Sequence, residues 1–423
     1  MKKAFALLTV LLILAAMLSA CDIGIGGGAT CEDEFGCVEV AKDEPIRIAY
    51  SFVLSGADAS LGEDTKRGVE MAAEEVQFEG QDVGMIQGHS IEVVGEDSLC
   101  TPEGGQTAAQ KLAADPKIAG IVGTNCSSAA RAAIPVICAA NIPMVSPSNT
   151  AIDLTLADRP ETYHCYLRTA HSDAIQGAAA AQFAAEYLGV TKAATVHDGS
   201  LYADQLQQQF AETFTGMGYE ITAQEAIQPT DTEMGSMLTR VAATGPELIY
   251  YPIFIAAGGH ITAQARETPG LEGVHLMGAD GMFSPDFWAA AGEAAIGVYH
   301  SSPDFSLFGE KYPAFLERHE AKYGEKTLAP FHAHAYDAAM LIFNAINKTA
   351  IDAGGGKLLI PKKAMRDALY ATANYEGLTG NLTCKAYGDC AAPVIAVYET
   401  FNPDPANWNP GAGPENDPRK VWP

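Results

Sequence analysis

Two neighbouring stretches decide the fold of this chain: Gly120-Ile121-Val122-Gly123-Thr124-Asn125-Cys126-Ser127-Ser128 and Ser146-Pro147-Ser148-Asn149-Thr150. In each, small hydroxyl residues follow an apolar run with the composition of a β-strand, and the first stretch opens an Ala-rich helical segment. Ligands bind beyond the carboxyl ends of the strands in an open α/β sheet, and a helix N-terminus there favours an anion. The two stretches therefore predict a crevice that binds a small zwitterion.

Outward from these stretches, apolar β-runs alternate with longer helical patterns, and a second series of similar size follows from about residue 163. The first series has predicted strands at residues 46–51, 91–95, 118–123 and 142–145, and predicted helices at residues 64–76, 105–114 and 129–140. This order predicts an α/β fold with doubly wound parallel sheets, arranged as two lobes. Pro135 has no N–H to donate, so the main part of its helix is expected to start there.

The composition is that of a globular protein with a strongly acidic surface. The 423 residues include 52 acidic and 26 basic side chains, which gives a formal net charge of −26, and 48% of the residues are apolar. Such a composition excludes disorder as the default state. The negative charge argues against nucleic acid or anionic lipid as a partner, and it does not indicate which small ligand binds.

The first residues have the pattern of an export signal. Lys2 and Lys3 precede an apolar run over residues 4–17, and Leu-Ser-Ala-Cys follows at residues 18–21. This pattern predicts a signal peptide over residues 1–20, and the last four residues look like a bacterial lipobox, which implies a lipid anchor on Cys21. An ordinary signal peptide with a chance cysteine is the alternative. The Gly-rich segment within residues 21–44 is expected to be a flexible tether and has no dinucleotide fingerprint.

The cysteine count agrees with an oxidising compartment outside the cytoplasm. Without Cys21, eight of the nine cysteines remain, an even number. The plausible pairs are Cys31 with Cys37, Cys384 with Cys390, Cys100 with Cys126, and Cys138 with Cys165. Eight cysteines allow about 105 connectivities, so these pairs are hypotheses. A zinc site is disfavoured because the sequence has no C-x2-C pair and no Cys/His cluster.

Residues from about 46 to 398 resemble the type I periplasmic binding proteins of ABC importers, in particular the branched-chain amino acid group. The resemblance is carried by motifs in a characteristic order: LSG at residues 54–56, LGEDTKRG at 61–68, VGED at 94–97, GTNCSS at 123–128, SPSNT at 146–150, VHD at 196–198, MGADG at 277–281 and AYDA at 335–338. Each motif alone is weak, but together they are specific.

The resemblance implies two lobes that are joined by three crossings and close over a ligand like a hinge. Lobe 1 is expected to comprise residues 45–166 and 301–378, and lobe 2 residues 167–300 and 379–400. The Pro-, Asn- and Gly-rich tail, residues 401–423, is expected to be loosely packed. The Cys100–Cys126 pair is similar to a family disulfide beside the site.

The resemblance also implies the ligand contacts. Ser127 and Thr150 are expected to bind the carboxylate and ammonium groups, and Ser148 to contribute backbone atoms. Tyr202 and Phe254 would be aromatic contacts from lobe 2. Asp280 lies where the family usually has a Glu that pairs with the ammonium. Asp is one methylene shorter, so the ligand must sit differently or a water must bridge, and Phe254 lacks the hydroxyl of a Tyr found in some relatives.

Structural interpretations of the same residues remain open. Ser127 can be only a helix cap, and Asp280 followed by Gly is a turn signal. His332 and His334 diverge on a helix, so no metal site is predicted. An enzyme with Ser127 as nucleophile is disfavoured because no G-x-S-x-G motif surrounds it.

The sequence thus predicts a monomeric, lipid-anchored binding protein without a cofactor, which passes a small amino acid to an ABC permease and ATPase complex. The alternatives are a ligand sensor for a signalling partner, and a binder of another small ligand such as urea or an aromatic acid.

Overall fold

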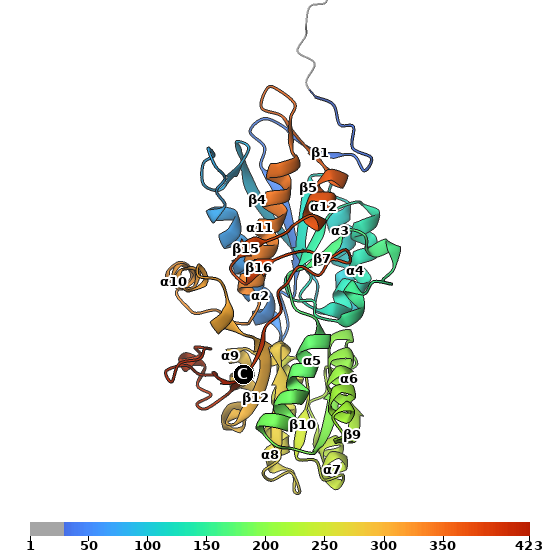
Figure 1. Ribbon diagram of the computed structural model, residues 1–423, viewed down its shortest axis with the longest axis vertical. Helices are drawn as coiled ribbons and strands as arrows, with labels where there is room; N and C mark the ends of the chain where they lie inside the picture. Colours follow the sequence, from blue (N-terminus) through green and yellow to red (C-terminus); the bar gives the residue numbers. More distant parts are fainter. Residues whose placement is uncertain (1–28) are drawn as a thin grey trace, which may run out of the picture.

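The computed structural model describes residues 29–423, which form two lobes stacked along the long axis of the molecule (Figure 1). The predicted signal peptide, Cys21 and the first part of the tether lie outside the described residues. No helix within residues 29–423 is both long and apolar enough to cross a membrane.

The first lobe is built on a six-stranded sheet that is parallel except for its short edge strand. Its strands, in spatial order, are β3 (Met85–Ile86), β4 (His89–Asp97), β2 (Ile46–Phe52), β5 (Ile118–Gly123), β6 (Met144–Ser146) and β7 (Tyr166–Arg168). Its helices are α2 (Ala59–Glu75), α3 (Pro102–Ala113), α4 (Ser127–Ala139), α10 (Tyr312–Tyr323), α11 (His332–Thr349) and α12 (Lys362–Tyr370).

Both faces of this sheet are covered, which is why its strands are apolar without alternation. Ile48 on β2 packs in the core formed with α2 and α11, and its neighbour Ala49 packs in the core formed with α3 and α4. On β5, Val122 likewise packs in the core formed with α2 and α11, and Ile121 in the core formed with α3 and α4. A parallel sheet buried on both sides requires such continuous apolar runs.

The second lobe repeats the plan with a seven-stranded sheet. Its strands, in spatial order, are β18 (Arg419–Trp422), β17 (Ile395–Glu399), β12 (Val298–Pro303), β11 (His275–Ala279), β10 (Leu248–Tyr250), β8 (Lys192–His197) and β9 (Glu220–Ala226). Its helices are α5 (Asp173–Gln182), α6 (Leu201–Gly216), α7 (Gly235–Ala243), α8 (Ile255–Glu267) and α9 (Pro285–Ala291). Strands β8 to β12 are parallel, and the two late strands β17 and β18 are antiparallel. The predicted α/β class with two parallel-sheet lobes is confirmed.

The chain passes between the sheets three times: between β7 and α5, after β12, and between residues 390 and 395. Short strands β15 (Tyr375–Gly377) and β16 (Gly380–Leu382) and the Cys384–Cys390 loop precede the third passage. The predicted division gave residues 379–400 to lobe 2. In the structure Cys390 is part of the first lobe's core and Asp389 pairs with Arg168, whereas β17 lies in the second sheet.

The N-terminal segment is fixed to the first lobe. Strand β1 (Cys37–Val40) pairs with β14 (Leu358–Pro361), and β13 (Ile351–Asp352) completes this small sheet. The carboxylate of Asp33 accepts hydrogen bonds from two N–H groups in the first turn of α12, those of Lys363 and Ala364, each at 3.0 Å. Within residues 29–423 four disulfides form, and they are the same pairs that the sequence suggests: Cys31–Cys37, Cys100–Cys126, Cys138–Cys165 and Cys384–Cys390.

One local prediction is wrong. The sequence predicts that the main helix after Cys126 starts at Pro135, but α4 continues from Ser127 to Ala139 with Pro135 inside it. An interior proline costs about 3 kcal/mol because a backbone hydrogen bond is lost. The helix tolerates this loss because an apolar face on both sides of the proline is buried: Ala129, Ala130, Ala133, Ile134 and Ile137.

The C-terminal tail is packed rather than loose. Figure 1 shows it in dark red beside α9. Trp408 is 5% exposed, and its ring lies edge-on against Trp288 of α9, with 5.0 Å between ring centroids. Its indole N–H donates to the carbonyl of Thr327, in the loop that follows α10 (2.9 Å). The burial of Trp408, together with the pairing of β18 with β17, orders a segment of otherwise polar composition.

Candidate ligand-binding cleft

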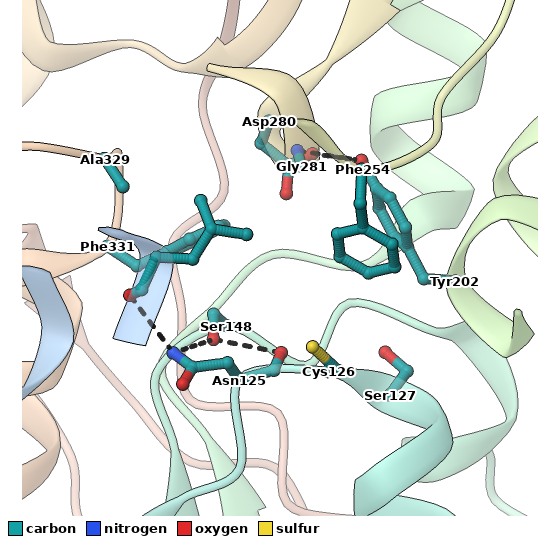
Figure 2. Close-up of a pocket in the computed structure, with 11 residues that line it drawn as sticks. Asn125, Cys126, Ser127, Ser148, Tyr202, Phe254, Asp280, Gly281, Ala329 and Phe331 are labelled. Carbon is teal, nitrogen blue, oxygen red and sulfur yellow. Dashed lines mark hydrogen bonds between the residues drawn. The ribbon is translucent and has the colours of Figure 1, made fainter. Parts of the chain in front are cut away.

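A cavity lies between the lobes, where strand ends from both sheets meet (Figure 2). It contains about 390 Å³ of unoccupied space, a figure that includes solvent at its mouth. The first lobe, the second lobe and the loop before α11 all contribute to its lining, which consists of Leu61, Asn125, Cys126, Ser127, Ser148, Tyr202, Phe254, Asp280, Gly281, Ala329 and Phe331.

The first-lobe side of the cavity is the N-terminus of α4. Ser127 is the first residue of this helix, so backbone N–H groups that lack a partner within the helix point toward the cleft. The N-cap residue, Cys126, is joined by a disulfide to Cys100, which fixes the start of the helix. Ser148 donates from its hydroxyl to the carbonyl of Asn125 at 3.1 Å. This side offers hydroxyls and a positive helix end.

The second-lobe side presents a buried carboxylate. Asp280 follows strand β11, and its Oδ1 accepts hydrogen bonds from the Nε2 of Gln176 (2.5 Å) and the hydroxyl of Tyr202 (3.1 Å). Both bonds end on Oδ1, which leaves Oδ2 for a ligand. Burial raises the pKa of Asp280 to about 6, although the hydrogen bonds from Gln176 and Tyr202 act against the rise. The ring of Phe254 packs against Tyr202 with centroids 5.4 Å apart.

Thr150 and Asp173 are buried next to the cavity but do not line it. Thr150 is predicted from the sequence as a ligand residue, and Asp173 is not. Thr150 is 1% exposed, and its hydroxyl has no hydrogen-bond partner within the described chain. Asp173 starts α5, is fully buried, and both its carboxylate oxygens lack partners there as well. Burial raises the pKa of Asp173 well above its usual range and the negative charge of Asp280 adds to the rise, while the neighbouring Thr150 hydroxyl acts against it. Buried polar atoms without partners are uncommon, so these groups are available to a ligand or to water.

The loop before α11 closes the remaining side. It carries Ala329 and Phe331 into the cavity. The N–H of Leu328 donates to Asp64 of α2 at 2.9 Å, and from the other side Trp408 holds Thr327. Both lobes therefore position this apolar wall.

Five of the six predicted ligand residues line the cavity: Ser127, Ser148, Tyr202, Phe254 and Asp280. The sixth, Thr150, is buried beside Asp173, whose N–H donates to its carbonyl at 2.8 Å. Asp173, Gln176 and Phe331 are not predicted from the sequence. An acidic residue at the start of the helix after a lobe crossing was the available signal for Asp173, whereas no motif marks Phe331.

Comparisons with known proteins agree with this geometry. A family model described as periplasmic binding protein matches residues 45–391. A leucine-, isoleucine-, valine-, threonine- and alanine-binding protein of Pseudomonas aeruginosa is 27% identical over 365 residues, which cover 86% of this chain and 92% of that protein.

Among solved structures, a leucine-binding protein, LivK, from Thermotoga maritima has a TM-score of 0.75 at 23% identity, covering 85% of this chain and 96% of that one. The branched-chain amino acid transporter substrate-binding protein LivJ from Streptococcus pneumoniae, in complex with isoleucine, has a TM-score of 0.72 at 25% identity, covering 90% of this chain and 100% of that one. The fold, the cleft between the lobes and the matched residues lead to one conclusion: this chain belongs to the periplasmic binding protein family.

Proposed function

We propose that this chain captures a small amino acid with an apolar side chain between its lobes, outside the cytoplasm, and delivers it to an ABC permease and ATPase complex. One observation carries the proposal. Across a small cavity, the hydroxyls and the N-terminus of α4 face the carboxylate of Asp280. The names of the Pseudomonas and Streptococcus relatives support the ligand class.

The binding mode follows from the charges on the two sides. The ligand carboxylate binds at the start of α4, where Ser127 and the free N–H groups favour an anion. The ligand ammonium binds Oδ2 of Asp280, because Oδ1 already accepts hydrogen bonds from Gln176 and Tyr202. The ligand side chain points toward Leu61 and Phe331, which are apolar. A desolvated zwitterion needs partners at both ends, and this arrangement supplies them.

An enzymatic role for Ser127 has no support in these contacts. Within the described chain its hydroxyl forms one hydrogen bond, which it accepts from the N–H of Ala151 at 3.3 Å. A nucleophilic serine needs a general base within hydrogen-bond reach. The proposal is therefore a binding protein and not an enzyme.

A ligand screen tests the proposal directly. Thermal unfolding is measured with each common amino acid, with urea and with benzoate as an aromatic acid, and hits are titrated by calorimetry. A ligand at 100 times its dissociation constant stabilises the folded protein by about 2.7 kcal/mol. Stabilisation by leucine, isoleucine or valine supports the proposal, and stabilisation by urea or benzoate alone contradicts it.

Delivery and anchoring need cellular tests. Cells that lack the gene should lose uptake of the identified amino acid, and wild-type protein should restore uptake whereas Asp280→Ala should not. The lipid anchor is tested with Cys21→Ser, which should release the protein from membranes into the soluble fraction. Cys21→Ser protein that stays on the membrane contradicts the anchor, and normal uptake without the gene contradicts the transport role.

A further inference from the structure

The carboxylate of Asp280 is held by an amide that is itself held in one orientation. Gln176 lies on the second turn of α5 and is fully buried. Its Nε2 donates to Oδ1 of Asp280 at 2.5 Å, to the carbonyl of Ser301 at 3.1 Å and toward the hydroxyl of Ser301 at 3.2 Å. The amide nitrogen therefore contacts oxygen atoms of Asp280, which follows β11, and of Ser301 on β12.

The other end of the amide meets a histidine. The Oε1 of Gln176 lies 2.6 Å from the Nε2 of His171, which is in the first crossing between the lobes and is 3% exposed. If the amide turned over, its oxygen would face the carboxylate of Asp280 and the carbonyl of Ser301, which are both acceptors. An amide has one acceptor end and one donor end, so a proton on Nε2 of His171 selects the observed orientation.

The state of His171 is consistent with this role. Burial lowers the pKa of His171 to about 4, so the ring is neutral at physiological pH and carries one proton. Its ring also stacks on Phe331 of the cavity wall, with centroids 6.0 Å apart. His171 thus contacts the crossing, the amide and the cavity wall together.

We propose that His171 and Gln176 are positioning residues for the ligand: they fix Oδ1 of Asp280 so that Oδ2 faces the ammonium group and prefers a cation to a neutral group. This inference rests on the proposed function. The titratable groups that face Asp280 are Tyr202 on α6, Asp173 on α5 and Tyr250 on β10. In the described chain no lysine or arginine stabilises the charged form of Asp280; the hydrogen bonds from Gln176 and Tyr202 do so.

The first test uses the ligand-free protein, so it does not depend on the proposed function. The titration of Asp280 is followed by ¹³C NMR of protein labelled at aspartate carboxyl carbons, with Asp280→Asn identifying the signal. Wild type should titrate near pH 6. Gln176→Leu removes a donor to the carboxylate, so the midpoint should move to higher pH. His171→Phe keeps the stacking on Phe331 and should move the midpoint in the same direction, by less.

Matched controls separate positioning from general damage. Gln207→Leu makes the same change at a buried glutamine of the second lobe, which bonds to Thr195 and not to Asp280. His300→Phe makes the same change at a buried histidine of that lobe that has no hydrogen-bond partner in the described chain. Both controls should leave the Asp280 midpoint at the wild-type value. If Gln176→Leu does not fold, Gln176→Asn, whose amide is one methylene too short to span the gap, replaces it.

The second test measures leucine binding by calorimetry from pH 5.5 to pH 8.5. The ammonium pairs with the ionised carboxylate, so affinity should fall as the pH drops through the pKa of Asp280. At pH 7 Gln176→Leu should bind leucine at least tenfold more weakly than wild type. The fall in its affinity on acidification should also begin at a higher pH than in wild type. In Gln176→Leu, the ratio of the affinity for leucine to the affinity for its 2-hydroxy acid analogue, which has no ammonium group, should also be smaller than in wild type.

An unchanged Asp280 midpoint in Gln176→Leu, or a shift equalled by the Gln207→Leu control, overturns the inference. A shifted midpoint in a protein that binds no amino acid leaves the positioning of Asp280 supported and refutes the proposed function instead. The two failures are therefore distinguishable.

Discussion

Replacing Asp280 by Asn should strengthen the fold while it weakens binding. The pKa of this buried carboxyl is about 6 in the folded protein, against an ordinary value of 3.8. The difference of about 2.2 units corresponds to about 3 kcal/mol of stability that the ionised carboxylate costs at neutral pH. Asn has nearly the same shape and no charge, and its oxygen can accept the hydrogen bonds from Gln176 and Tyr202. The variant is therefore expected to be more stable than wild type by up to this amount.

The pH dependence of this gain has a definite sign. The folded wild type binds more protons than its unfolded chain between pH 3.8 and about 6, so the contribution of Asp280 to stability falls as pH rises through that window. The advantage of Asp280→Asn should be absent below pH 3.8, grow up to about pH 6 and stay constant above it. Binding should change in the opposite sense, because the ligand ammonium is left buried without a carboxylate, at a cost of about 3–5 kcal/mol.

The assay combines urea unfolding of ligand-free protein at pH 4 and pH 8 with calorimetry at pH 7.5. A suitable control is Asp304→Asn, because Asp304 is also buried but forms an ion pair with Lys420 at 2.7 Å. That control should destabilise the fold and leave affinity nearly unchanged. Unchanged stability of Asp280→Asn at pH 8, or a loss of affinity below threefold, would refute the reasoning.

Three further predictions concern other parts of the cleft. Ser127→Ala should weaken amino acid binding roughly 10- to 150-fold in calorimetry, because a hydrogen bond to a charged group is lost; a loss as large as that of the carboxylate variant contradicts the assigned roles. Trp408→Phe keeps an aromatic ring, though a smaller one, and loses the hydrogen bond to Thr327, so displacement of radiolabelled ligand should show dissociation about two- to tenfold faster; an unchanged rate means that the bond does not hold the closed state. Replacing Cys100 and Cys126 by Ser should lower stability by about 2–5 kcal/mol in urea unfolding, and added ligand should recover part of the loss; equal stability with and without the disulfide contradicts a bracing role.

Much of the fold follows from local patterns. The apolar run of β5 and the hydroxyls after it predict both a strand and the first-lobe side of the cavity at the end of that strand. The strand composition, the switch to helical periodicity and the helix N-terminus all lie within a few residues of one another. Such signals survive in any tertiary context. The interior position of Pro135 cannot be predicted from local patterns. The apolar face that offsets the lost hydrogen bond is buried only once α4 packs on the sheet.

The rest of the site depends on contacts that are distant in sequence. Gln176 and Asp280 are 104 residues apart, and nothing near either residue indicates that they meet. Asp173 has the local appearance of an ordinary acidic residue in a first helical turn, and its position after a lobe crossing becomes a signal only together with its complete burial. In the same way, the order of the tail depends on Trp408 finding Trp288 and Thr327, which lie in different lobes.

The position of Trp408 also makes it a natural fluorescent probe of lobe closure. The chain has three tryptophans. Trp288 and Trp422 pack within the second lobe, while the indole N–H of Trp408 reaches a carbonyl of the first. When the lobes separate, this indole alone exchanges a protein carbonyl for water. Its fluorescence emission should therefore shift to longer wavelength on opening and back on ligand capture, so that the hinge motion can be followed in real time with unlabelled protein.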